Sequence, residues 1–329
     1  FEAEAALDAG LIDGLAYRDE VIDAALEAAG EDAELVPLAT YARRADGEPD
    51  EPDAVAALIV AQGPIQRGTA RFDRVISADD LAESLAEARE DEAIDAVVLR
   101  LDTGGGSAVA SETVGREVTL LRDSGKPIIV SMSNAAASGG YWIAMGASHI
   151  VAQPATYTGS IGVIAGKPDL AGAWAQLGVN WASIERGRNA DLLSINRPLD
   201  PAGRQRLEQS VERLYERFKA GVAAGRGLQP DAVEAAAQGR VWLGAQALPL
   251  GLVDELGGLP TARAAAARLL ELPEDARVEL RHYPPGRSPF ERLRGLADAP
   301  WLGALADALT WLRIAGAPAP VEVQLPHIR

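Results

Sequence analysis

One serine stands among small residues directly after an apolar run, where its hydroxyl could act as a nucleophile. Residues 127–132 form the apolar run, which predicts a strand, and residues 135–140 read Ala-Ala-Ala-Ser-Gly-Gly. Ser138 therefore has no bulky sequence neighbour to shield it. The same residues also fit the first turn of a helix with Ser138 as its N-cap, because serine side chains accept hydrogen bonds from helical N–H groups.

A glycine cluster follows a second predicted strand and could stabilise an oxyanion. Residues 94–101 are strand-like, and residues 102–107 read Asp-Thr-Gly-Gly-Gly-Ser. Glycines allow backbone conformations in which N–H groups point at a ligand, although such a cluster alone also fits a tight turn. The carboxyl ends of parallel strands meet at one edge of a sheet. Together, the two segments favour acyl chemistry in which amides stabilise a tetrahedral oxyanion.

A serine nucleophile needs a base, and the three histidines are poorly placed to provide it. His149 lies 11 positions after Ser138, a separation of ~16 Å along a helix. We expect His149 to cap a helix or to begin a strand. His282 and His327 belong to the C-terminal stretch, where solvent-exposed roles are more common. The sequence therefore gives little support to a Ser-His-Asp triad.

A neutral lysine is the other candidate base, and the chain has three lysines. Lys126 precedes the strand that leads to Ser138, which places it ~20 Å away at the opposite edge of the sheet. Lys219 shares a predicted helix with several charged residues and fits a solvated face. Lys167 is sterically possible, but the Pro-Asp pair after it predicts an exposed turn that would not lower its pKa. The chain thus contains half of a catalytic pair.

Composition limits the classes of partner. The chain has 329 residues, with 31 basic and 48 acidic side chains and a formal charge of −17, which disfavours binding to nucleic acid or anionic lipid. The absence of cysteine excludes disulfides and thiolate metal sites. No apolar run reaches the ~20 residues of a membrane helix. Since the chain begins with neither methionine nor a leader, we expect any export signal or anchor to lie outside it.

The order of predicted elements indicates an α/β domain with appendages. Helical periodicity covers residues 3–29, and an acidic, proline-containing loop at residues 45–53 marks a boundary. Strand-like and helical segments then alternate, which predicts βαβ units in a mainly parallel sheet. The alternating segments are residues 54–60, 79–91, 94–101, 111–124 and 127–132. Further strands are expected at residues 148–152 and 179–184, a helix at 201–225, and a Pro-rich tail with a Trp-bearing segment at 301–314.

Several motifs together resemble those of one protein family. They are Asp-Thr-Gly-Gly-Gly-Ser at 102–107, Ser-Gly-Lys-Pro at 124–127, Ala-Ser-Gly-Gly-Tyr-Trp at 137–142 and Thr-Gly-Ser-Ile-Gly at 158–162. The likeness continues through residues 237–244 and 251–258, and covers about residues 53–265. In these motifs the sequence resembles signal peptide peptidase A, also called protease IV.

This resemblance implies a crotonase/Clp-protease-like α/β fold and a serine endopeptidase with a Ser-Lys dyad. It further implies degradation of cleaved signal peptides at the periplasmic face of the bacterial inner membrane, by a homo-oligomer that is anchored through a segment absent from this chain. Peptides are the implied partners, with no cofactor, no metal ion and no nucleic acid.

Carried over by position, Ser138 matches the nucleophile, and Gly105 and Gly139 match the residues whose amides form the oxyanion hole. Ser160 matches the serine that positions the base lysine. The usual proline before the first oxyanion glycine is here Gly104. The lysine itself is missing, because residues 186–191 read Arg-Gly-Arg-Asn-Ala-Asp where short family members carry it. Arginine cannot replace it, because it stays protonated at neutral pH.

The long form of the family explains the missing lysine by duplication, with the lysine in the N-terminal half and the serine in the C-terminal half. We therefore expect residues 1–52 to be the end of a preceding repeat with an acidic linker. Residues 53–271 would be the peptidase domain and residues 272–329 a Pro-rich tail. The alternatives are a catalytically incomplete half that serves assembly or as a scaffold, and a crotonase-type acyl-CoA enzyme with a carboxylate base.

Overall fold

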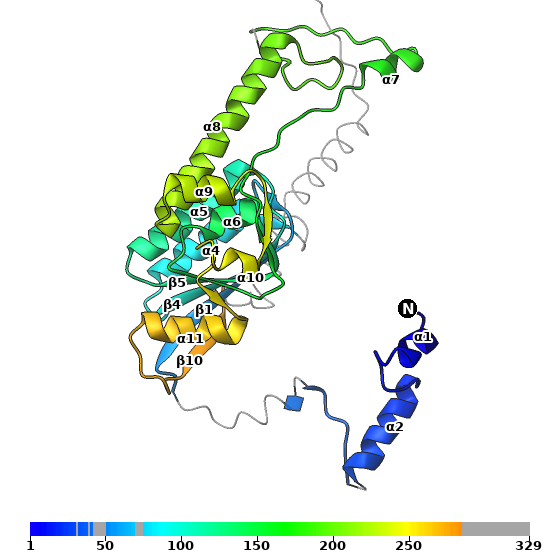
Figure 1. Cartoon of the computed structure of the whole chain (residues 1–329), viewed down its shortest axis with the longest axis vertical. Coiled ribbons are helices and arrows are strands. Elements are labelled where there is room, and N and C mark those ends of the chain that lie inside the picture. The colour runs from blue at the N-terminus through cyan, green and yellow to red at the C-terminus, as the bar shows by residue number, and fades with distance from the viewer. Residues whose placement is uncertain (31, 39, 42–50, 70–74, 188, 285–329) are drawn as a thin grey trace, which may run out of the picture. The chain divides into compact units, whose positions relative to one another are not determined.

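The computed structural model describes the chain except residues 31, 39, 42–50, 70–74, 188 and 285–329. Within the larger unit, a mainly parallel sheet forms the centre of the described residues (Figure 1). In spatial order its strands are β10 (Val278–His282), β1 (Ala54–Gln62), β4 (Ala96–Thr103), β5 (Ile128–Ala137), β6 (His149–Ala152) and β9 (Glu255–Leu256). All neighbours in this path are parallel. The predicted α/β class is confirmed.

Two further strands extend the sheet beside the end of β5. β7 (Tyr157–Gly159) pairs in parallel with the last three residues of β5, and β8 (Val241–Leu243) pairs antiparallel with β7. A separate parallel pair, β2 (Ile65–Gln66) and β3 (Ile76–Ser77), lies after β1. The carboxyl ends of β4, β5 and β7 therefore come together at one edge of the sheet.

Apolar strands form the core because helices cover both faces of the sheet. β4 and β5 are nearly continuous runs of buried residues, as expected for parallel strands between two helical layers. On one face lie α4 (Ala78–Glu90), α5 (Ala108–Asp123), α6 (Gly139–Ala144), α8 (Pro201–Arg226) and α9 (Pro230–Ala236). The opposite face is covered by α11 (Leu259–Leu269), as Figure 1 shows.

The ends of the main helices follow from local capping chemistry. Ser77 accepts the Asp80 N–H at the start of α4, and Ser107 accepts the Ala110 N–H at the start of α5. Asp200 caps α8, which ends at Gly227 in the left-handed conformation. The predicted helices at residues 79–91, 111–124 and 201–225 are confirmed within a few residues.

Three sequence expectations differ from the structure. Residues 179–184 form no strand, and Trp181 and Ile184 there are exposed, so their alternation does not reflect a buried face. β5 continues to Ala137, five residues beyond the predicted end, because β7 supplies a new partner. Residues 278–282 pair with β1, so the sheet extends past the expected boundary at residue 271. The Trp-bearing segment at 301–314 lies outside the described residues.

Residues 1–52 form a separate small unit that has no buried residue in its described part. It contains α1 (Ala3–Asp8) and α2 (Arg18–Ala29), with a break at residues 9–17 inside the predicted helical stretch. Gly10 at the break has φ +67°, which favours glycine. Several large apolar side chains of this unit, including Leu11 and Leu35, are exposed.

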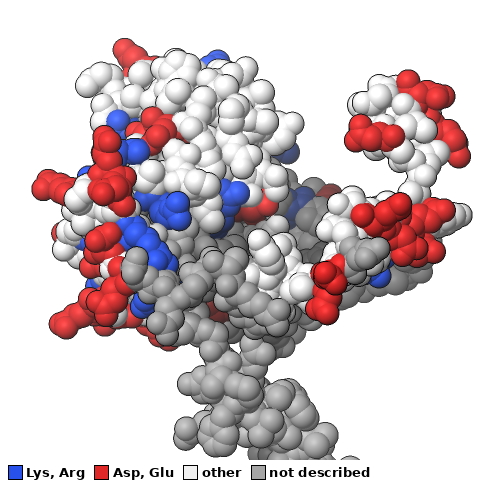
Figure 2. Space-filling view, turned by 90° about the horizontal axis from the view of Figure 1, so that it is seen from below, with Lys and Arg blue, Asp and Glu red and all other residues white. Residues whose placement is uncertain are grey.

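Charge is distributed over the described surface of both units. Figure 2 shows Asp and Glu spread over one face, with Lys and Arg among them on the larger unit. The described residues of this face thus mix both signs rather than forming one basic stripe. Among the described residues, no helix combines the length and apolar character required to cross a bilayer.

The assignment of β10 to the folded domain can be tested by stability. Val278 is 3% exposed, so Val278→Ala should cost about 2 kcal/mol and lower the Tm by roughly 4–8 °C. Arg281→Ala on the same strand is the control, because Arg281 only pairs with the neighbouring Glu279 at the surface and its loss should change the Tm little. Equal, negligible shifts for both variants would contradict the pairing of β10.

Candidate active site

Ser138 occupies a one-residue turn between β5 and α6. Its φ and ψ are 52° and −116°, a conformation that non-glycine residues rarely adopt. The turn is fixed by two main-chain bonds, from the Ser138 N–H to Gly159 O (2.8 Å) and from the Trp142 N–H to Ser138 O (2.9 Å). Ser138 is the N-cap residue of α6, as one interpretation of the sequence expected, but its side chain makes no capping bond. Among the described residues, the hydroxyl has no hydrogen-bond partner.

The glycine cluster packs directly against this turn. Gly105 has φ +109°, and a Cβ on it would lie 2.9 Å from both Gly139 N and Ser138 Cβ. A Cβ on Gly106 would lie 2.2 Å from Ile65 O. Both positions therefore require glycine, as the tight-turn interpretation expects.

Three glycine N–H groups lie near the turn, and they differ in whether they already donate a hydrogen bond. Gly139 N–H, at the start of α6, has no acceptor among the described residues. Gly105 N–H donates to Thr103 Oγ1 at 3.0 Å, whereas Gly106 N–H has no acceptor in the described part of the chain. A Cβ built on Gly139 would lie 3.2 Å from Gly106 N, so the two free amides are neighbours. Sequence reasoning missed Gly106, because three consecutive glycines do not indicate which N–H is already bonded.

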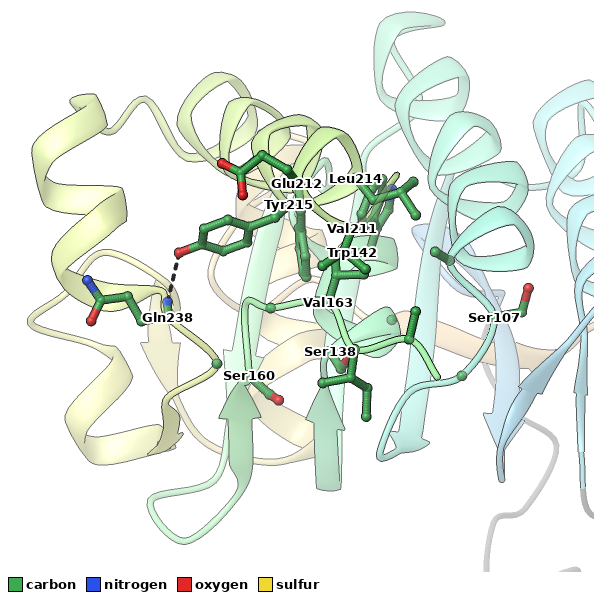
Figure 3. Close-up of a pocket in the computed structure, with 18 of the residues that line it drawn as sticks. Ser107, Ser138, Trp142, Ser160, Val163, Val211, Glu212, Leu214, Tyr215 and Gln238 are labelled. Carbon is green, nitrogen blue, oxygen red and sulfur yellow. Dashed lines mark hydrogen bonds between the residues drawn. The ribbon is translucent and has the colours of Figure 1, made fainter. Parts of the chain in front are cut away.

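A cavity of about 760 Å³ opens beside Ser138. Figure 3 shows Ser138 and Ser160 next to each other at the ends of adjacent strands β5 and β7. Ser160 has φ +50°, and its N–H donates to Arg240 O at 2.7 Å. The structure thus brings Ser138, Gly139 and Ser160 to one cavity. Gly105 does not line the cavity but packs against the backbone of the serine turn.

The wall of the cavity opposite the serines is largely apolar. Trp142 and Phe218 stack with ring centroids 4.6 Å apart, and Val211 and Leu214 on α8 line the same side. Tyr215 OH accepts the Gln238 N–H at 3.0 Å and so connects α8 to the segment before β8 (Figure 3). This wall suits an apolar side chain of a ligand.

Lys219 lies close to this wall but is held in its charged form. Its Nζ lies 2.8 Å from both Glu216 and Glu234, and 4.4 Å from the centre of the Tyr215 ring. The hydrogen bonds to Glu216 and Glu234 raise the pKa of Lys219 above its ordinary value. A protonated amine cannot take a proton from serine, so Lys219 is unsuited to be the base.

The other two lysines are engaged elsewhere. Lys126 Nζ donates to Ala88 O (2.9 Å) and Asp91 O (2.8 Å), at the opposite end of β5 from the serine turn. Burial lowers the pKa of Lys126, but it lies far from the site. Lys167 Nζ donates to Ser194 O (2.7 Å) and to a second carbonyl of the same segment. Neither lysine lines the cavity.

The described histidines and carboxylates form neither a triad nor a metal site. His149 begins β6, as expected, and its Nε2 lies 3.1 Å from Glu255. His282 ends β10, and His327 lies outside the described residues. Within the described ranges, no group of three or more His, Asp or Glu side chains could hold a metal ion.

A free serine hydroxyl on a strained turn thus lies beside two free amides and an apolar cavity, an arrangement that suits a hydrolase with a serine nucleophile. The model of peptidase family S49 matches residues 120–273 of the chain. A protein from Synechocystis sp., slr0021, named as a protease, is 40% identical over 191 residues, which are 58% of this chain and 68% of that protein. The chain therefore belongs to peptidase family S49.

Two further proteins are similar to the chain, one in sequence and one in structure. The chloroplastic serine protease SPPA of Arabidopsis thaliana is 38% identical over 85% of this chain, which spans only 43% of that relative's length. A ClpP1 mutant from Listeria monocytogenes aligns with 63% of this chain and 94% of its own, at 14% identity and a TM-score of 0.42. Since that score is low, the α/β class is assigned from the sheet topology itself.

The contact between the glycine loop and the serine turn can be tested with neighbouring glycines. Gly105→Ala should destabilise the domain by about 2–4 kcal/mol, because the new methyl meets Gly139 N in a backbone conformation that disfavours alanine. Gly104→Ala is the matched control, since nothing lies within 4 Å of its Cβ. Thermal unfolding measures both. Equal Tm values for the two variants would contradict the close packing.

Proposed function

We propose that the chain is the serine-bearing part of a Ser-Lys peptidase, with Ser138 as its nucleophile. The observation that carries this proposal is the unbonded hydroxyl of Ser138, held on a strained strand-to-helix turn at the mouth of a cavity. Strain of this kind persists only where the surroundings fix it, and it is common at active sites. The established membership of peptidase family S49 supports the same assignment.

In the proposed reaction, an uncharged lysine amine takes the proton of Ser138 Oγ while the oxygen attacks the scissile carbonyl carbon. The negative charge that develops on the carbonyl oxygen is stabilised by the N–H groups of Gly139 and of the glycine loop. We assign the loop donor to Gly106, because the Gly105 N–H is already used by Thr103. The lysine then returns its proton to the leaving amine, and water hydrolyses the acyl-enzyme.

The base lysine would come from outside this chain, and Ser160 would orient it. The three lysines of the chain are bonded elsewhere or held charged, and Ser160 lies beside Ser138 with its side chain at the cavity (Figure 3). A donor at this position could fix an incoming amine next to the nucleophile. The lysine would be supplied by a preceding homologous domain.

A repeated local structure in the two units supports such a preceding domain. Gly10 N–H bonds to Leu7 O and Leu11 N–H to Ala6 O, at 3.0 and 2.9 Å. The equivalent bonds, Gly251 to Leu248 and Leu252 to Ala247, are 3.0 and 3.1 Å long, and follow α10 (Gly244–Ala247) as the first pair follows α1. The two glycines have φ of +67° and +71°. The same turn ends α7 (Ala171–Gln176) at Gly178, with φ +68°, so it supports a repeat only together with the sequence likeness of residues 11–20 to residues 251–256.

Burial differs between the two copies in an informative way. Leu252 is fully buried in the larger unit, whereas Leu11, which likewise follows the turn glycine, is 63% exposed. In the larger unit, the same sequence pattern packs against the sheet. We therefore expect the exposed apolar side chains of residues 1–52 to pack against a sheet in another part of the protein.

Peptides with apolar side chains are the proposed substrates, because Trp142, Phe218 and Leu214 line the cavity. Cleaved signal peptides fit this chemistry, since their central region is apolar. By analogy with the family resemblance, we propose action at the periplasmic face of the bacterial inner membrane by a homo-oligomer.

An acyl-CoA enzyme on the same fold would need a carboxylate base, and the two candidates at the cavity are poorly suited. The hydrogen bond from Lys219 lowers the pKa of Glu234, which weakens it as a base. Glu212 also lines the cavity, but Figure 3 shows its carboxylate directed away from Ser138. No observation favours this function over the peptidase.

The proposal predicts that catalysis requires an added lysine domain. The 329-residue chain alone should cleave an apolar signal-peptide substrate about 10³-fold more slowly than the chain combined with the homologous domain that precedes it. In the combined protein, Ser138→Ala should remove the activity, whereas Lys167→Ala and Lys219→Met should retain it within about two-fold. Peptide cleavage is followed by mass spectrometry.

Two outcomes would decide against the proposal. Cleavage by the chain alone at the full rate, abolished by Lys167→Ala, would show an internal base. A combined protein that is folded but leaves the peptide intact would favour the scaffold alternative, and turnover of an acyl-CoA that survives Ser138→Ala would favour the crotonase-type enzyme.

A further inference from the structure

Strand β5 contains a bulge immediately before the serine turn. Leu101 of β4 pairs with Met132 of β5, and the next pair is Thr103 with Ala136. One residue of β4, Asp102, therefore faces three residues of β5, residues 133–135. Bulges bend a strand and redirect the side chains that follow, and they are frequent next to active sites. The bulge thus determines the position of the backbone at Ser138.

Asp102 holds the bulge through both carboxylate oxygens. Its Oδ1 accepts the Ala135 N–H at 3.2 Å, and its Oδ2 accepts Asn134 Nδ2 at 2.8 Å. Oδ2 also accepts Gln62 Nε2 at 3.4 Å, which connects the bulge to β1. These bonds satisfy an N–H that the irregular pairing would otherwise leave without a partner.

Arg100, two residues earlier on the same face of β4, holds the start of the bulge. Its Nη1 donates to Ser131 Oγ (2.8 Å) and Met132 O (3.2 Å), and its Nη2 donates to Ser133 Oγ (3.0 Å). Burial lowers the pKa of the guanidinium below its ordinary value, and the charge of Asp102 partly opposes this shift. The two β4 side chains therefore contact the bulge along its whole length.

The bulge also marks the point at which β5 changes partner. Residues 129–131 pair with β6, and residues 135–137 pair with β7, which delivers Gly159 O to the Ser138 N–H. The opposite side of the bulge is held by Thr156 Oγ1, which donates to Ser133 O at 2.6 Å. A shift of the bulge would move Ser138 relative to both the glycine loop and Ser160.

We propose that Asp102 is a positioning residue for the nucleophile, because its carboxylate fixes the β5 bulge and thereby the distance between Ser138 and the glycine amides. The inference rests on the proposed function in one respect, that Ser138 is the reacting residue. Asp102 lies on β4 and does not line the cavity, so it acts through the backbone of β5 rather than on a substrate.

The absence of cysteine makes a direct test possible without the missing lysine. Ser138→Cys introduces the only thiol of the chain, and its pKa and rate of alkylation by iodoacetamide report the surroundings of the nucleophile. Amides that point at the sulfur should hold the thiol pKa below ~8.5. In this background, Asp102→Ala should raise the thiol pKa and slow alkylation at pH 7 by about ten-fold.

The sign of the change in the thiol pKa distinguishes a positioning role of Asp102 from a direct effect of its charge. Removal of a nearby negative charge would by itself lower the thiol pKa and speed alkylation. The exchange Asp102→Asn with Asn134→Asp keeps the net charge, and it keeps a side-chain oxygen at position 102 that can accept the Ala135 N–H. It also keeps a hydrogen bond between the two side chains, with donor and acceptor exchanged. It should restore the alkylation rate to within about two-fold.

Asp95→Ala provides the matched structural control. Asp95 Oδ2 accepts the Val55 N–H at 2.8 Å, so it also joins β4 to a neighbouring strand, but at the opposite end of the sheet. Its loss should lower the Tm about as much as Asp102→Ala and leave the thiol unchanged.

An unchanged or faster alkylation in folded Asp102→Ala protein would overturn the inference, as would an exchange variant that folds without recovering the rate. Because no peptide cleavage is measured, these results are independent of the base. If the combined protein fails to cleave peptides while the thiol behaves as expected, the peptidase proposal fails and the positioning by Asp102 stands.

Discussion

The site depends on the backbone conformation of Ser138, which the surrounding chain must hold against its own preference. A non-glycine residue in this region costs about 1–3 kcal/mol. The cost is met by the bond to Gly159 O, by the first bond of α6 and by the packed backbone of Gly105. Two of these contacts come from segments that are distant in sequence, β7 and the loop after β4, so both segments must be in place before the hydroxyl faces the cavity.

The same constraint explains why the edge of the sheet is built from small and polar residues rather than continued core. A Cβ at Gly105 would push the loop away from the turn, and a Cβ at Gly106 would collide with the backbone of Ile65. Thr103 uses its hydroxyl to fix the Gly105 N–H. The amide left free is then the next one along, beside Gly139. Close approach of two backbones, rather than any charged side chain, creates the electropositive place where an oxyanion would sit.

Much of the fold could be predicted because apolar strands and amphipathic helices leave a local pattern, as in residues 96–103 and 108–123. The strand at 278–282 was missed because its alternation lies next to prolines and charges, and its partner β1 is more than 200 residues away. The bulge of β5 depends on pairing between strands, which no single segment encodes. The small-residue motif indicates Ser138, and the resemblance to the family indicates Gly139 and Ser160, whereas the choice of Gly106 over Gly105 depends on one side-chain bond.

The position of Lys219 shows why proximity alone does not make a base. Its ammonium is close to the cavity wall, yet two carboxylates and an aromatic ring stabilise the charge and so oppose loss of the proton. A base lysine needs the reverse, a pocket that removes water and offers no anion. The cavity beside Ser138 has an apolar wall, and the two carboxylates that also line it are directed away from Ser138 (Glu212, Figure 3) or paired with Lys219 (Glu234). An amine that entered from another domain would therefore be desolvated there, while Lys219 stays charged.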